Sequence, residues 1–138
     1  MPDELILVIE DDQELNANLS ELLGLIDFRH EAVTDGAVAF ERVLQLRPKL
    51  VLLDLQLPNV SGFDILASIR KDARLYNTKV IVITSEKFIE LTKVRQADSV
   101  LVKPFTLSAL RIAIERVLCG DTGTRPDKPF SSGFGIND

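Results

Sequence analysis

Four short apolar runs, each ending abruptly in polar residues, constrain the fold of this chain more than any other feature. The runs cover residues 5–9, 50–53, 80–83 and 99–102. Runs of this length fit strands better than helices, and Leu, Val and Ile dominate them. They do not alternate with polar residues, which is typical of strands buried on both faces of a parallel sheet. The sequence therefore predicts an α/β domain with a parallel central sheet.

Between these runs, apolar residues recur at helical spacing. The pattern predicts helices over residues 15–26, 37–47, 63–69, 86–95 and 107–117. Asp11 or Asp12 is expected to cap the first helix, and Pro48 to stop the second. Residues 30–34 form a more polar strand, as expected at a sheet edge. Right-handed crossovers then give a doubly wound (βα)₅ domain with strand order 2-1-3-4-5 and helices on both faces of the sheet.

The residues that follow the apolar runs carry the chemistry. In chain order they are Glu10-Asp11-Asp12, Asp54, Thr84 and Lys103. The carboxyl ends of parallel strands meet at one edge of the sheet, where open α/β folds bind ligands. Carboxylates about 4 Å apart repel by on the order of 1–4 kcal/mol, so such a cluster either raises its pKa values or binds a cation. Oxygen donors without Cys or His indicate Mg²⁺ rather than zinc or copper.

Taken in order, these residues form a motif that resembles the CheY-like receiver domain of two-component response regulators. The motif comprises Glu10-Asp11, Asp54, Pro58 with Gly62, Thr84 and Lys103-Pro104. The resemblance covers roughly residues 4–118, nearly the whole chain before its last segment. It implies the fold that the strand and helix patterns predict.

The resemblance also implies roles for individual residues. Asp54 would be the nucleophile that accepts a phosphoryl group. Lys103 would pair with a phosphoryl oxygen, and Thr84 would donate its hydroxyl to the same group. Mg²⁺ would be held by Glu10, Asp11, Asp54 and the backbone carbonyl of Gln56. No other cofactor is implied, and the Lys103–Pro104 peptide bond is expected to be cis.

A phosphoacceptor of this kind works in a phosphorelay. The resemblance implies that a sensor histidine kinase or a histidine phosphotransfer protein supplies the phosphoryl group. The domain would be a signalling module, not an enzyme, promoting only its own phosphorylation and dephosphorylation. The downstream protein partner is not specified by the sequence.

Charge and hydropathy add expectations about partners and location. The formal net charge of −5 leads us to expect no direct nucleic-acid binding. No apolar stretch approaches the roughly 18 residues of a membrane span. The acidic start, Met1-Pro2-Asp3-Glu4, is unlike a signal peptide. We therefore expect a cytoplasmic protein without membrane contact.

Two departures from the family pattern leave an alternative open. The family usually has Tyr or Phe three residues before the lysine, where this chain has Val100. The stretch from Thr84 to Lys103 is also shorter than usual by about three residues, or roughly one helical turn. Both fall in the region that normally reports phosphorylation to partners, and Val100 favours the alternative to the phosphoacceptor, a phosphorylation-independent protein-interaction module with a receiver fold. A phosphatase with an Asp nucleophile is a weaker alternative, because its second acid would stand where Gln56 stands.

Composition divides the chain into two parts. Residues 1–119 are expected to form one receiver domain, as their length suggests. Residues 120–138 are rich in Gly, Pro and Ser and poor in apolar residues. We expect them to form a flexible tail or a truncated linker.

Overall fold

The structure is a computed structural model that describes residues 4–85 and 96–119. The expected fourth helix at residues 86–95 and the expected tail at residues 120–138 lie outside the described residues. The described elements are β1 (Leu5–Ile9), α1 (Gln13–Leu25), β2 (Arg29–Val33), α2 (Ala39–Leu46), β3 (Leu50–Asp54), α3 (Gly62–Lys71), β4 (Lys79–Thr84), β5 (Ser99–Val102) and α5 (Leu107–Leu118), with single 3₁₀ turns at Gly36–Val38 and Ala73–Leu75. No helix in this part of the chain has the length and apolarity needed to cross a membrane.

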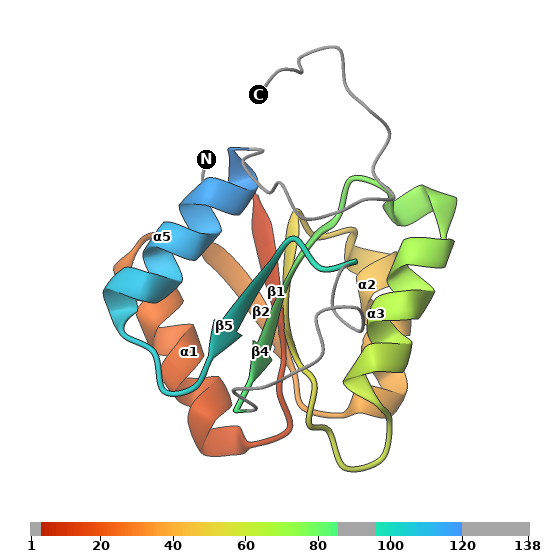
Figure 1. Cartoon of the computed structure of the whole chain (residues 1–138), viewed down its shortest axis with the longest axis horizontal. Coiled ribbons are helices and arrows are strands. Elements are labelled where there is room, and N and C mark those ends of the chain that lie inside the picture. The colour runs from red at the N-terminus through yellow and green to blue at the C-terminus, as the bar shows by residue number, and fades with distance from the viewer. Residues whose placement is uncertain (1–3, 86–95, 120–138) are drawn as a thin grey trace.

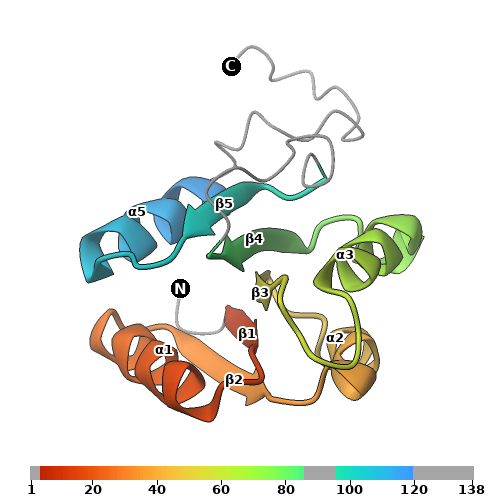
Figure 2. The same cartoon turned by 60° about the horizontal axis from the view of Figure 1, so that its bottom comes forward.

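The five strands form one parallel sheet in the order β2-β1-β3-β4-β5, which confirms the predicted doubly wound fold. Figure 2 shows the strands in this order. The direction of winding changes between β1 and β3, so their carboxyl ends lie side by side. Ile9 pairs with Leu53, and Asp54 pairs with Ile83. With this register, the carboxyl ends of β1, β3 and β4 lie at nearly the same level along the sheet.

Helices cover both faces of the sheet, α1 and α5 on one side and α2 and α3 on the other (Figure 1). Successive strand residues point to opposite faces. Ile9 and Leu53 pack in the core on the α2/α3 side. Val8 and Leu52 pack in the core on the α1/α5 side. This double burial explains why the strands read as continuous apolar runs.

Helix α1 packs its apolar residues, together with one buried amide, against the core on the α1/α5 side. Asp12 caps the helix, because its Oδ1 accepts the backbone N–H groups of Glu14 and Leu15. The buried residues are Asn16, Leu19 and Leu23. The apolar residues at helical spacing in the predicted helix also face this core: Leu19 is buried, and Leu15, Leu22 and Ile26 are partly buried against it.

Helix α2 is shorter than the predicted span of residues 37–47. Gly36–Val38 forms a 3₁₀ turn, in which Asp35 Oδ1 accepts the Ala37 N–H. The α-helix therefore begins at Ala39 and ends at Leu46. Arg47 adopts a left-handed conformation with φ 46°, and Pro48 has no N–H to continue the helix.

Gly62 begins α3 at a point where only hydrogen fits. A Cβ atom at this position would lie 2.5 Å from Leu55 Cα and 2.7 Å from the Asp54 carbonyl oxygen. These are backbone atoms next to the acidic edge of the sheet, so they cannot move aside as a flexible side chain could. We expect Gly62→Ala to lower the free energy of unfolding by about 1–3 kcal/mol, measured by urea denaturation.

Gly24 supplies a matched control in α1. A Cβ atom there would meet nothing within 4 Å. Gly24→Ala should therefore raise the free energy of unfolding by about 0.5–1 kcal/mol, because alanine loses less conformational freedom in a helix. Equal stability of the Gly62→Ala and Gly24→Ala proteins would contradict the close approach of α3 to β3.

Candidate functional site

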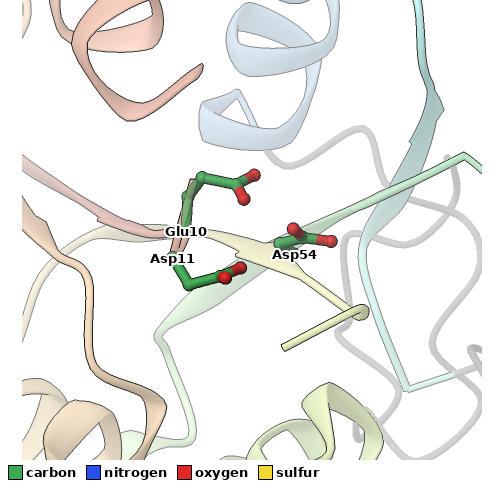
Figure 3. Close-up of side chains that lie close together, drawn as sticks. All are labelled: Glu10, Asp11 and Asp54. Carbon is green, nitrogen blue, oxygen red and sulfur yellow. The ribbon is translucent and has the colours of Figure 1, made fainter. Parts of the chain in front are cut away.

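Three carboxylates converge where β1 and β3 end. Glu10 and Asp11 directly follow β1, and Asp54 is the last residue of β3. Each contributes a carboxylate oxygen to a group whose members lie within 4.8 Å of one another. Figure 3 shows the Glu10 and Asp11 side chains projecting from the end of β1 toward Asp54. The parallel register thus produces the acidic edge that the sequence predicts.

Asp54 is buried and held at both carboxylate oxygens. Only 2% of the residue is exposed. Its Oδ1 accepts the backbone N–H of Gln56 at 2.9 Å. Its Oδ2 lies 3.4 Å from the Nζ atom of Lys103. These contacts give the carboxylate a fixed direction at the mouth of the sheet.

Lys103 reaches the carboxylates from the far strand β5. Its backbone N–H donates to the Thr84 carbonyl at 2.8 Å, which fixes the chain as it leaves the sheet. The Lys103–Pro104 peptide bond is cis, as expected. The lysine Nζ atom lies 3.5 Å from Glu10 Oε1 as well as 3.4 Å from Asp54 Oδ2. The ammonium group of Lys103 therefore lies close to the carboxylates at the ends of both β1 and β3.

The Glu10 carboxyl has a raised pKa in this setting. Burial is the main cause that raises its pKa to about 8, followed by the hydrogen bond and charge of neighbouring Asp54. The Asp12 N–H, 3.2 Å from Glu10 Oε2, and the Lys103 charge oppose this rise. When no divalent metal ion is bound, the cluster thus favours a proton on Glu10 near neutral pH.

The raised pKa predicts how stability depends on pH without divalent cations. Glu10 titrates near its usual value of 4.5 when unfolded and near 8 when folded. Between these values the folded state binds the extra proton, so the free energy of unfolding should fall as pH rises, by up to about 1.4 kcal/mol per pH unit. Urea denaturation with chelator at several pH values checks this. Glu10→Gln should flatten the dependence, and an identical slope in that variant would contradict the assignment to Glu10.

The other predicted site residues lie around this cluster. Thr84 is fully buried at the end of β4 and pairs with Val102 of β5. Gln56 stands two residues after Asp54, and its side-chain Oε1 accepts a hydrogen bond from Ser85 Oγ at 2.7 Å. This contact joins the segments that follow β3 and β4. Val100 is half-buried and packs against the core on the α2/α3 side.

Sequence reasoning missed Asn16, which supports the cluster from α1. Its Nδ2 donates to the Glu10 carbonyl oxygen at 2.8 Å. The available signal was its spacing: Asn16 stands three and seven residues before Leu19 and Leu23, on one helical face. A buried amide normally has a hydrogen-bond partner, so a polar residue on an apolar helix face indicates such a bond.

The donor atoms of this cluster suit a hard divalent cation. All three side chains offer carboxylate oxygens, and no Cys or His belongs to the group. Oxygen donors of this kind are the usual ligands of Mg²⁺ and Ca²⁺, whereas zinc and copper favour nitrogen or sulfur. The residues present therefore fit the expected metal.

An open, doubly wound parallel sheet with carboxylates and a lysine at the carboxyl ends of its strands defines a CheY-like α/β fold. The family model of the response regulator receiver domain matches residues 6–115. The chain therefore belongs to the receiver domain family of two-component response regulators, whose members are signalling modules.

Curated relatives are consistent with this family. The chain is 30% identical over 117 residues to the DNA-binding dual master transcriptional regulator RpaA of Synechocystis sp., covering 82% of this chain and 48% of RpaA. It is 35% identical over 100 residues to the DNA-binding response regulator MtrA of Mycolicibacterium paratuberculosis, covering 72% and 44%. Response regulator ArlR of Staphylococcus epidermidis is 32% identical over 126 residues, covering 89% and 54%. The chain thus spans about half the length of these relatives.

Solved structures show the same fold. The response regulator TrrA of Thermotoga maritima, in complex with Mg²⁺-BeF, has a TM-score of 0.76 at 24% identity, with 83% of this chain and 98% of that chain covered. The chemotaxis protein CheY4 of Vibrio cholerae has a TM-score of 0.77 at 23% identity, with the same shares covered. At this identity the likeness establishes the fold alone.

The relatives correct one expectation. Net charge led us to expect no direct nucleic-acid binding, but RpaA and MtrA are DNA-binding regulators. That expectation is wrong because a net charge of −5 describes only these 138 residues. Charge on a receiver domain does not constrain the DNA-binding activity of the regulators to which it is related.

Proposed function

We propose that this domain accepts a phosphoryl group on Asp54 from a phosphohistidine of a sensor histidine kinase or a histidine phosphotransfer protein. An Asp54 oxygen attacks phosphorus, the phosphorus–nitrogen bond breaks, and the electron pair returns to the donor imidazole. The observation that carries the proposal is the buried Asp54 carboxylate, held by the Gln56 N–H at 2.9 Å and close to Lys103 Nζ at 3.4 Å.

The proposal assigns a metal site to the same cluster. Glu10, Asp11, Asp54 and the backbone carbonyl of Gln56 would hold Mg²⁺, which neutralises negative charge on the phosphoryl oxygens when bound. Lys103 would pair with a phosphoryl oxygen as a compact charge. The Thr84 hydroxyl would donate to another. Support comes from the convergence of the three carboxylates within 4.8 Å of one another.

The proposal extends to output and location. We take residues 1–119 as the receiver domain and 120–138 as a tail or linker. The domain promotes only its own phosphorylation and dephosphorylation and acts in the cytoplasm.

Because RpaA and MtrA are DNA-binding regulators, control of DNA binding is the output that we propose.

Val100 keeps the interaction module as a second candidate. The residue is half-buried against the core and lacks the aromatic ring that the family usually has at this position. Its β-branched side chain also restricts χ1. Such a domain would keep the acidic pocket yet signal by docking alone.

Intact-mass measurement after incubation with acetyl phosphate and Mg²⁺ separates the two candidates. The phosphoacceptor should gain one phosphoryl group, and chelation of Mg²⁺ should prevent the gain. A folded protein whose mass never changes would overturn the phosphoacceptor function and favour the interaction module.

A further inference from the structure

Asn16 holds the backbone from which two of the three clustered carboxylates project. Only 5% of this residue is exposed. Its Nδ2 donates to the Glu10 carbonyl oxygen at 2.8 Å, across six residues of sequence. In a buried setting such a bond is hard to replace, because water is not available as an alternative partner.

The bond constrains Asp11 as well as Glu10. The Glu10 carbonyl and the Asp11 N–H belong to one planar peptide unit. Fixing the carbonyl direction therefore fixes the plane from which the Asp11 side chain departs. The preceding peptide is also fixed, because the Glu10 N–H donates to the Val33 carbonyl at 3.0 Å.

Asp11 depends on this backbone constraint more than its neighbours do. The Glu10 and Asp54 carboxylates have their own partners, Asp12 N–H, Gln56 N–H and Lys103. Across residues 4–85 and 96–119, the structure shows no hydrogen bond or ion pair made by the Asp11 carboxylate. The backbone that Asn16 holds therefore sets the position from which the Asp11 side chain leaves the end of β1.

We infer that Asn16 is a positioning residue for the metal site. It sets the direction of the Asp11 carboxylate, and through it the affinity for Mg²⁺, without contacting the ion. This inference rests on the proposed function, because it presupposes that the cluster binds Mg²⁺.

The inference is tested by titrating the wild-type and Asn16→Leu proteins with Mg²⁺ at constant pH and monitoring the amide NMR signals. Leucine is close to asparagine in size but cannot donate to the Glu10 carbonyl. Groups that orient metal ligands commonly contribute about 10- to 100-fold in affinity, so we expect a weakening of about that size. The Asp11 amide signal should also shift in the metal-free variant.

Leu19→Ala is the control for a purely structural role. Leu19 is 1% exposed and lies on the same face of α1, three residues further along. We expect Leu19→Ala to lose stability while keeping wild-type Mg²⁺ affinity. If Asn16→Leu behaved in the same way, the inference would be overturned.

The remaining outcomes also decide the question. If Asn16→Leu does not fold, Asn16→Ala serves for the same comparison. A wild-type protein that binds no Mg²⁺ would overturn the proposed metal site and the inference with it. Binding by wild type together with unchanged affinity in a folded Asn16 variant would overturn the inference alone.

Discussion

Replacing Asp54 by Asn should abolish the phosphoryl mass that the wild-type protein gains from acetyl phosphate and Mg²⁺. An amide is a far weaker nucleophile than a carboxylate and brings no negative charge to a metal site. The neighbouring groups are arranged around a carboxylate, with Gln56 N–H on Oδ1 and Lys103 Nζ near Oδ2. Intact-mass spectrometry of both proteins under identical conditions gives the comparison.

Asp12→Asn is the matched control for this loss. Asp12 is exposed, caps α1 and lies outside the carboxylate cluster. Asparagine is as good an N-cap as aspartate, so the fold should be retained. This variant should gain the full phosphoryl mass. Phosphorylation of the Asp54→Asn protein would mean that another carboxylate is the acceptor.

Removing Arg70 should have the largest effect on stability. The Arg70 and Asp98 side chains are only 1% and 0% exposed, and their atoms Nη2 and Oδ2 lie 2.9 Å apart. Arg70 also donates to the carbonyls of Gln96 and Thr78. Arg70→Met would leave the Asp98 charge buried without its cation, which commonly costs about 3–5 kcal/mol. Urea denaturation followed by circular dichroism measures the loss.

Arg42→Met is the control, because it removes an ion pair of similar length at the surface. Arg42 and Glu31 are 38% and 43% exposed in their side chains. Exposed pairs contribute at most about 1 kcal/mol, since water and salt screen them. Equal losses in the two variants would show that burial of the Arg70–Asp98 pair adds nothing to stability.

Much of the fold could be predicted because the relevant signals are local. The apolar runs identified β1, β3, β4 and β5, and the handedness of crossover connections restricted the strand order. Of the two expected caps of the first helix, Asp12 is the one observed, and this signal is also local, since its side chain accepts N–H groups two and three residues away. The predicted start of α2 failed where Asp35 forms a 3₁₀ turn before the helix.

The functional edge was predictable only in part. Placement of Glu10, Asp11 and Asp54 follows from parallel strands ending together, which the pattern of runs already contains. Lys103 was expected at the same edge because it follows an apolar run, but its contacts with Glu10 and Asp54 were not predicted. Asn16 was missed because its hydrogen bond goes to a backbone carbonyl, so no particular residue type marks its partner.

The sequence by itself determined the strands, their order and the residues at their carboxyl ends, because hydrophobic periodicity and short connections act over a few residues. Tertiary structure decided which side chains of opposite charge pair across long stretches of sequence. Arg70 and Asp98 are 28 residues apart, and Lys103 and Glu10 are 93 apart. Such pairs depend on register and packing between elements, and many sequences of the same pattern could pair their charges differently. The closeness of buried opposite charges is therefore a property of the folded chain.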